Sequence, residues 1–117
     1  MKTKIDKSLL SGSTTMLILR LLKSKDMYGY QMIETLEKQS NNIFTLKAGT
    51  LYPLLHTLEK NGILKSYEII TENIRSRKYY SLTNSGRKLL QDKKDEWEIY
   101  SSAVNMVMEG GFNYATI

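Results

Sequence analysis

The spacing of apolar positions changes along the chain, and each spacing predicts a different element. Leucines at 51, 54, 55 and 58 recur at intervals of three and four, which places them on one face of a helix. Asn61-Gly62 ends this helix, because glycine accepts a left-handed backbone at little cost. Segments 64–71 and 77–82 are rich in Ile, Tyr and Leu and predict two strands, with the polar tip of a hairpin at 72–76.

Three further helices surround this segment. A helix at about 8–24 is apolar on more than one face, which indicates burial on two sides and therefore a partner subunit. A second helix at about 28–39 carries Met32, Ile33 and Leu36 on one side. Thr83 stands where an N-cap belongs and opens a long helix at about 84–108. Gly110-Gly111 ends that last helix.

A two-sided helix followed by a basic hairpin is typical of a winged helix-turn-helix. The predicted fold class is mainly α (α+β): a winged helix-turn-helix with a long C-terminal dimerisation helix. We expect a DNA-binding domain over residues 1–82, a dimerisation helix over 83–109 and a flexible tail over 110–117.

Size and composition narrow the class without deciding it. A chain of 117 residues is long enough for one core. Its net charge of +5 permits an acidic partner, although charge of this size also serves solubility. Cysteine is absent, and no apolar stretch approaches the ~20 residues of a membrane span. We therefore expect a cytoplasmic protein with no membrane contact.

The predicted third helix has an outer face that is suited to DNA. Turning each residue by 100° sets its polar side chains opposite the leucine stripe, where a recognition helix reaches base edges. Most polar helix faces bind no partner. The basic hairpin that follows this helix in the sequence strengthens the expectation that this face binds DNA. Pro53 removes a backbone donor, and the sequence leaves open whether it bends the helix or is tolerated near a late start. The candidate contacts are Lys47, Gly49, Thr50, Tyr52, Pro53, His56 and Lys60.

The hairpin is the second candidate surface. Arg75, Arg77 and Lys78 cluster at and after its tip. The segment from Thr45 to Leu82 contains six basic residues and three acidic ones, which gives it a net charge of +3. That is enough to position a phosphate backbone but not to specify a sequence.

The last helix carries an apolar seam that a domain of this size cannot cover by itself. Burial of one large side chain is worth about 1.5–3 kcal/mol, so a symmetric homodimer through the first and last helices is expected. The candidate dimer residues are Leu10, Leu17, Leu90, Trp97, Tyr100, Val104 and Val107, with Lys93 at one seam position. Trp97 either lines a pocket for a flat aromatic ligand or packs at the dimer contact.

Catalysis has no support in the sequence. His56 is the single histidine, there is no cysteine, and no phosphate loop, nucleophile motif or metal-ligand spacing occurs. We predict that the chain is not an enzyme and has no cofactor and no metal site.

Three strings together resemble the PadR family of bacterial transcriptional regulators. They are Tyr28-Gly29-Tyr30, Gly49-Thr50-Leu51-Tyr52-Pro53 with Leu58-Glu59-Lys60-Asn61-Gly62, and Lys78-Tyr79-Tyr80-Ser81-Leu82-Thr83-Asn84-Ser85-Gly86. The likeness covers about residues 8–108, and the length is similar to the short-tailed group, whose C-terminal part is a single dimerisation helix.

This resemblance implies a homodimeric repressor that binds a roughly palindromic double-stranded operator and is released by a small planar aromatic effector. The effector residues that it implies are Leu9, Ser13, Met16, Trp97 and Ser101. Drug-sensing members can carry an acidic residue near the position of Ser101. Because serine is not acidic, a preference for cationic drugs is not expected in this chain. Lys47 stands where the family often has a small or capping residue.

Two rival functions remain open at this point. A winged-helix protein–protein module would have a neutral or acidic recognition face, whereas Lys47, His56 and Lys60 are present here. A small-molecule carrier would bind ligand at Trp97 without binding DNA. The operator sequence, the target genes and the direction of any effector response do not follow from the sequence.

Overall fold

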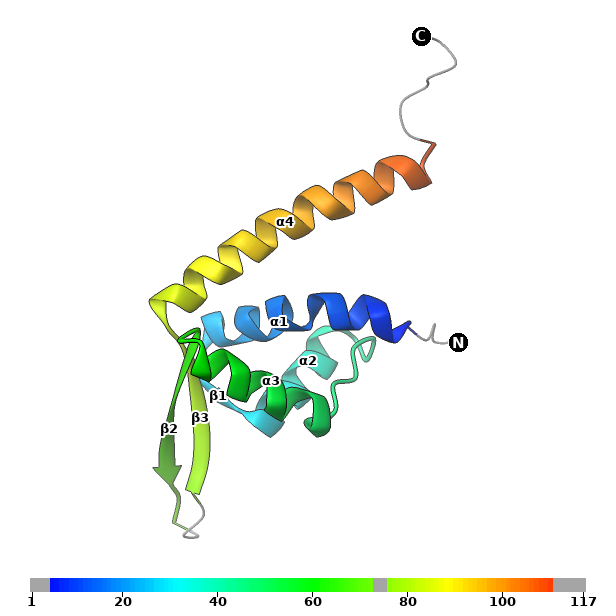
Figure 1. Cartoon of the computed structure of the whole chain (residues 1–117). Helices are drawn as coiled ribbons and strands as arrows, with labels where there is room; N and C mark the ends of the chain where they lie inside the picture. The colour runs from blue at the N-terminus through cyan, green and yellow to red at the C-terminus, as the bar shows by residue number, and fades with distance from the viewer. Residues whose placement is uncertain (1–4, 73–75, 111–117) are drawn as a thin grey trace.

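A computed structural model describes residues 5–72 and 76–110 of the chain. Three helices and a small sheet form one body, from which a hairpin and a long helix extend on opposite sides (Figure 1). The elements in order are α1 (Lys7–Ser24), β1 (Met27–Tyr28), α2 (Gly29–Gln39), α3 (Ala48–Lys60), β2 (Leu64–Ile70), β3 (Ser76–Leu82) and α4 (Asn84–Met108).

The core lies where α1, α2 and α3 meet the inner face of the sheet. Ile18, Leu19, Met32, Leu51 and Leu55 have no exposed surface. The leucine stripe of α3 is therefore buried as its spacing predicts, with Leu58 beside it. Leu64, Tyr80 and Leu82 close the core from the sheet.

Two helix starts follow simple capping chemistry. The Asp6 carboxylate accepts a hydrogen bond from the Ser8 backbone N–H at 2.9 Å and begins α1. The Thr83 hydroxyl accepts from the Gly86 N–H at 3.0 Å and begins α4, as predicted. In contrast, Lys47 precedes α3 without a side-chain cap.

The sheet has three antiparallel strands in the order β1-β3-β2. Tyr79 stands opposite Tyr67 on β2 and opposite Tyr28 on β1, so one tyrosine from each strand forms a row across the sheet. The sequence predicted β2 and β3 to within a residue or two, but it placed Tyr28 in the second helix. That placement is wrong, because a two-residue strand has no periodicity and exists only through its pairing with β3.

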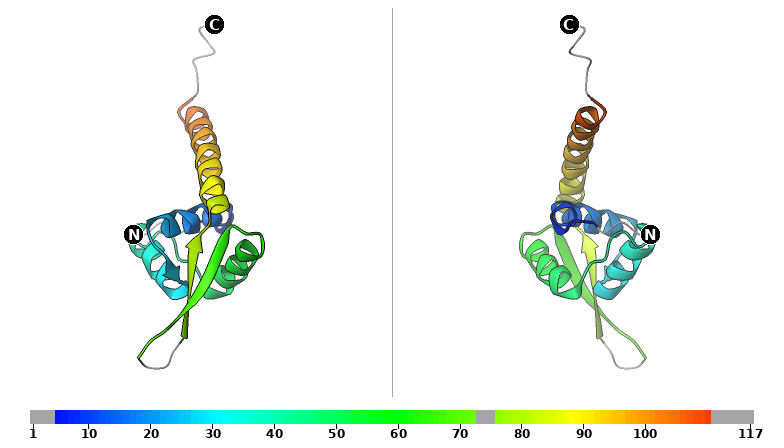
Figure 2. Two further views of the ribbon diagram at one scale, coloured as in Figure 1. Left: turned by 90° about the vertical axis from the view of Figure 1, so that its left-hand side faces the viewer. Right: turned by 90° about the vertical axis from the view of Figure 1, so that its right-hand side faces the viewer.

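Helix α4 leaves the body soon after it begins. Gly86 and Leu90 are buried, whereas every residue from Lys94 to Gly110 except Ser101 is exposed. Seen from two opposite sides, α4 and the β2–β3 hairpin point away from each other (Figure 2). A Cβ on Gly86 would overlap the Ile63 carbonyl oxygen, so glycine is needed where α4 meets the body.

The predicted fold class is confirmed: the chain is mainly helical, with a winged helix-turn-helix and a long C-terminal helix. Predicted and observed bounds of α1 and α4 agree to within one residue. Arg75 and all of the predicted tail except Gly110 lie outside the described residues.

Candidate nucleic-acid interface

The outer face of α3 is open, as the leucine stripe requires. Thr50, Tyr52, Pro53, His56 and Lys60 are exposed, and a Cβ added to Gly49 would contact nothing. The helix continues through Pro53 without a break. Lys47 is also exposed, at the residue that precedes the helix.

Tyr52 does not stand free on this face. Its ring lies edge-on to Tyr30 with 6.4 Å between ring centres, and a Cβ at Gly29 would overlap its hydroxyl. Partial burial, followed by the neighbouring Tyr30, raises the pKa of Tyr52 above its usual value. The hydroxyl therefore remains protonated at neutral pH, where it can donate a hydrogen bond.

Gly29 and Tyr52 depend on each other, which is testable. Gly29→Ala is expected to displace the Tyr52 ring and to lower the free energy of unfolding by about 1–3 kcal/mol, the usual cost of overpacking. Chemical denaturation of the variant measures this cost. In the Tyr52→Ala background the same substitution should cost much less, because the obstructing ring is gone. Equal costs in both backgrounds would show that the overlap is not the cause.

A row of tyrosines supports the wing, which we define as β2, β3 and their connection. Tyr67 stacks on Tyr79 with centres 5.8 Å apart, and Tyr79 meets the edge of Tyr28 at 5.4 Å. The Tyr67 hydroxyl donates to Asp26 at 2.6 Å, ahead of α2. The Arg77 guanidinium lies 4.6 Å from the centre of the Tyr28 ring. Arg77 is therefore held against the sheet by a cation–π contact while remaining exposed.

Lys78 connects the wing to α3. Its ammonium lies 3.4 Å from one carboxylate oxygen of Glu59. The other carboxylate oxygen of Glu59 accepts a hydrogen bond from the Ser66 hydroxyl. The same ammonium sits 5.4 Å from the centre of the Tyr80 ring. The pKa of Lys78 is raised, mainly by Tyr80 and then by Glu59. Lys78 is thus partly engaged within the protein, although its side chain remains 47% exposed.

The Glu59 pair gives a pH prediction. The hydrogen bond from Ser66, and then Lys78, hold the pKa of Glu59 below its usual 4.5. A lowered folded-state pKa stabilises the fold above the unfolded value, and this stabilisation is lost as the pH falls through the folded value. Glu59→Gln should therefore be less stable at pH 7 by under about 1 kcal/mol, since the pair is largely solvated.

Urea denaturation at several pH values measures this difference. It should shrink below pH 4.5 and vanish further into acid. Glu109→Gln, at the far end of α4, is the matched control for loss of one carboxylate. A constant difference across the whole pH range would contradict the linkage.

A cleft of about 730 Å³ joins the outer face of α3, the start of α2 and the wing. Tyr52, His56, Arg77 and Lys78 line it, as predicted contacts from two separate elements. Further lining residues are Tyr28, Gly29, Tyr30, Glu34, Ser76 and Tyr80. Charge and spacing in the sequence did not indicate Tyr28, Tyr30 and Glu34 as residues of this cleft, although the Tyr-Gly-Tyr string contains the first two.

The remaining predicted contacts lie elsewhere on α3. Lys47 and Thr50 line a smaller hollow of about 260 Å³ against the start of α1. Lys60, in the last turn of α3, lines neither hollow.

The predicted effector residues meet between α1 and α4. Leu9, Ser13, Met16 and Trp97 line a pocket of about 350 Å³, together with Ser8, Gly12, Lys93, Glu96 and Tyr100. Ser101 does not line it, and its hydroxyl instead donates to the Glu98 carbonyl oxygen at 3.4 Å. Trp97 and Tyr100 lie with ring centres 6.1 Å apart. We call this cavity the Trp97 pocket.

The predicted dimer residues divide into three groups. Trp97, Tyr100, Val104 and Val107 are 46%, 59%, 40% and 77% exposed on α4. Leu90 is buried within the protomer, where α4 first meets α1, so it serves the intramolecular core. Leu10 and Leu17 are half-buried on α1.

Within residues 5–72 and 76–110, no cluster of histidine and carboxylate side chains could hold a metal ion. None of the helices in that part of the chain is both long enough and apolar enough to cross a bilayer.

Several known proteins are similar to this chain in sequence and in fold. A transcriptional regulator from Clostridium thermocellum is similar over 84% of this chain and 95% of its own, at 34% identity and a TM-score of 0.78. A PadR family transcriptional regulator from Eggerthella lenta matches 87% of both chains at 30% identity, also with a TM-score of 0.78. Protein X of Lysinibacillus sphaericus is 32% identical over 102 residues, which make up 87% of this chain and 94% of that protein.

Residues 18–92 match the transcriptional regulator PadR-like family. Its members are transcriptional regulators and not enzymes, so the prediction that the chain is not an enzyme is confirmed. Half of the chain or more falls within the match, including α2, α3, the wing and the first turns of α4. This chain therefore belongs to the PadR-like family of transcriptional regulators.

Proposed function

We propose that this protein is a homodimeric repressor that binds a roughly palindromic double-stranded operator. The observation that carries the proposal is the cleft between α3 and the wing, where Tyr52, His56, Arg77 and Lys78 converge from two elements. The hairpin extends on the side away from α4 (Figure 1), so a duplex could lie against this cleft without meeting α4. Membership of a regulator family supports the same reading.

Each element has a distinct role in the proposal. Helix α3 enters the major groove, where Thr50, Tyr52 and His56 approach base edges, and Gly49 and Pro53 allow a close backbone approach. Lys47 and Lys60 lie at the two ends of α3 and reach phosphates. Arg77 and Lys78, together with Arg75 as predicted from the sequence, contact the phosphate backbone beside the groove. Glu34 repels phosphate and so keeps the phosphate backbone of the DNA on the wing side of the cleft.

The proposed dimer forms through α4. Tyr100, Val104 and Val107 are exposed on one side of this helix, together with Met108, which is 78% exposed. An apolar stripe of this length is costly to leave in water, and pairing with a second copy removes it. Residues 1–82 would then act as the DNA-binding domain and residues 83–109 as the dimerisation helix, in a cytoplasmic protein.

The proposed effector is a small planar aromatic molecule in the Trp97 pocket. Trp97 and Tyr100 offer two rings at one wall, and Leu9 and Met16 offer apolar surface at the other. The pocket lies between α1 and α4, so a ligand there would alter the angle of α4 and with it the spacing of the two DNA-binding domains. Quenching of Trp97 fluorescence, with Trp97→Phe as the blank, tests this binding.

A fluorescence-anisotropy titration tests the function as a whole. The duplex upstream of the protein's own gene is compared with a scrambled duplex at two salt concentrations. Specific binding that weakens steeply with salt is the expected result, because phosphate contacts release counterions. Equal weak binding to both duplexes would favour a protein–protein module. Ligand binding at Trp97 without any DNA binding would favour a small-molecule carrier.

A further inference from the structure

Two tyrosines stand together at the wall of the cleft where α2 meets α3, and we call Tyr30 and Tyr52 the tyrosine pair. Their ring centres are 6.4 Å apart and their planes meet at 70°, the edge-to-face arrangement that aromatic rings favour. Both line the cleft, and they are 61% and 40% exposed. The pair therefore offers a firmly held ring surface on the side of the protein that is proposed to meet DNA.

The hydroxyl of Tyr52 is turned away from the cleft. A Cβ added to Gly29 would overlap the hydroxyl oxygen, Cζ and Cε1 of Tyr52, so the far end of this ring rests against the backbone of α2. A base that enters the cleft meets the side of the Tyr52 ring, which carries only C–H groups. Tyr52 is therefore suited to an apolar contact rather than to a hydrogen bond with a base.

The other two tyrosines of the cleft already carry cations. The Arg77 guanidinium lies 4.6 Å from the centre of the Tyr28 ring, and the Lys78 ammonium lies 5.4 Å from the centre of the Tyr80 ring. Within residues 5–72 and 76–110, no lysine or arginine lies over a ring of the tyrosine pair. Tyr28 and Tyr80 thus position charges for phosphate, whereas the tyrosine pair keeps its ring surface free.

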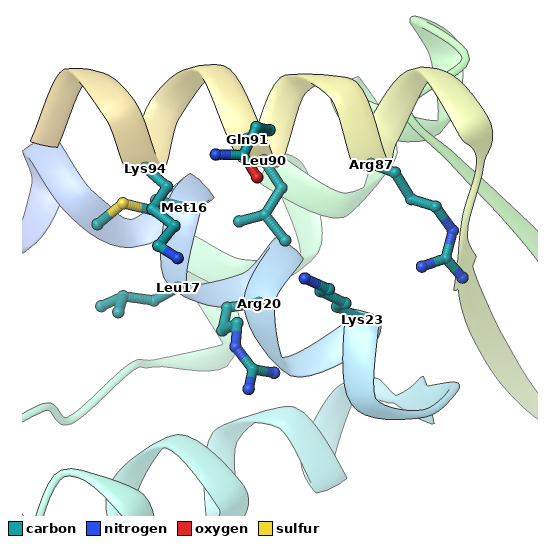
Figure 3. A pocket seen from close by; sticks show the side chains of 8 residues that line it. All are labelled: Met16, Leu17, Arg20, Lys23, Arg87, Leu90, Gln91 and Lys94. Carbon is teal, nitrogen blue, oxygen red and sulfur yellow. The ribbon is translucent and has the colours of Figure 1, made fainter. Parts of the chain in front are cut away.

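The tyrosine pair also stands apart from the face between α1 and α4. A hollow of about 480 Å³ between these helices is lined by four cations, Arg20, Lys23, Arg87 and Lys94, and by the predicted dimer residue Leu17 (Figure 3). This hollow and the Trp97 pocket share no residue with the cleft. A dimer partner or an effector at that face therefore does not use either ring of the pair.

The major groove offers one apolar group among its base edges. Guanine, adenine and cytosine present hydrogen-bond donors and acceptors there, whereas thymine adds a C5-methyl group. A ring surface placed against an amino or carbonyl group would leave that group without a partner, which is costly. The same surface placed against a methyl group removes apolar area from water.

We propose that the tyrosine pair selects thymine in each half-site by packing against its C5-methyl group, which makes Tyr30 a specificity-determining residue. This inference rests on the proposed operator binding by α3. It adds a residue of α2 to the base-reading surface, and it assigns to Tyr52 a contact through its ring rather than through its hydroxyl.

Replacement of thymine by uracil tests the proposal, because uracil keeps every hydrogen-bonding group of thymine and lacks only the methyl. The duplex is one that the full-length protein binds specifically, either the upstream duplex or one selected from a random pool. Each thymine is replaced in turn, at the matching positions of both half-sites, and affinity is measured by anisotropy. One position should weaken binding about fourfold for each half-site, and about 15-fold for the two together, the value of one buried methyl in each.

Protein variants then assign the methyl contact to the pair. In Tyr30→Ala, which alters an exposed side chain, the ratio of thymine to uracil affinity at that position should fall from about 15 to below about 4. Tyr30→Phe and Tyr52→Phe keep the rings and should keep the ratio. Lys60→Ala, outside the cleft, is the matched control: it should weaken binding to both duplexes and leave the ratio unchanged.

Three results would overturn this inference while leaving operator binding intact. Specific binding could be insensitive to uracil at every position, or the sensitivity could persist undiminished in Tyr30→Ala. Tyr30→Phe could also weaken binding as much as Tyr30→Ala, which would show that the hydroxyl acts and not the ring. Failure to bind any duplex specifically, even from the random pool, would instead overturn the proposed function and this inference with it.

Discussion

Replacing Arg77 by alanine is expected to weaken operator binding about 60-fold near 0.1 M salt, because each phosphate contact contributes about 0.9 log units there and the proposed dimer has two wings. The slope of log affinity against log salt should also fall by about 2. Arg77 is the residue of choice because it is exposed yet held 4.6 Å from the centre of the Tyr28 ring. Little side-chain freedom is then lost on binding.

Anisotropy titrations at several salt concentrations measure both quantities. Arg77→Lys keeps the charge, so it should retain the salt slope and lose only part of the affinity. Lys88→Ala, on α4 and not among the residues that line the cleft, controls for the change in net charge. A salt slope that stays unchanged in Arg77→Ala would show that the wing does not contact phosphate. An equal fall in Lys88→Ala would show that only net charge matters.

Replacing Val107 by aspartate is expected to raise the dissociation constant of the dimer at least about a hundredfold, because it buries an unpaired carboxylate in the proposed interface. Val107 is 77% exposed in the protomer. The substitution should therefore leave the fold of each subunit intact, with unchanged circular dichroism and thermal unfolding. Since two half-sites are read together, operator binding should be lost along with the dimer.

Sedimentation velocity at micromolar concentration separates dimer from monomer. Asn105→Asp is the matched control, since it also adds one negative charge to the exposed end of α4 but lies off the apolar side. If Val107→Asp remained dimeric, the interface would lie elsewhere. If it became monomeric yet still bound the operator with full affinity, the dimer would not be needed for DNA binding.

Local patterns predicted most of the fold, and the reason is visible in single elements. The leucine spacing of α3 follows from helical geometry, and Leu51 and Leu55 are fully buried as a result. Thr83 begins α4 through a hydrogen bond that spans only three residues. β1 was not predicted, because its two residues form a strand only through their pairing with Tyr79 and Tyr80, which lie about fifty positions away in the chain.

The sequence predicted which residues belong to the candidate interface, but not how they are arranged in space. The outer face of α3 and the basic run of β3 could each be identified from charge and spacing. That Lys78 pairs with Glu59, or that Tyr52 rests against Gly29, depends on how α2, α3 and the wing pack together. Leu90 was assigned to the dimer seam because its spacing matches Trp97, yet it is buried within the protomer.

The sequence by itself determined the elements with local causes: the apolar stripe of α3, the glycine after it, the hairpin, the cap of α4 and the family strings that contain them. Only the tertiary structure decided which of these segments meet. It brought Tyr28, Arg77 and His56 to one cleft and gathered four cations between α1 and α4. Periodicity and capping act over a few residues, whereas contacts between distant segments depend on the packing of the whole core.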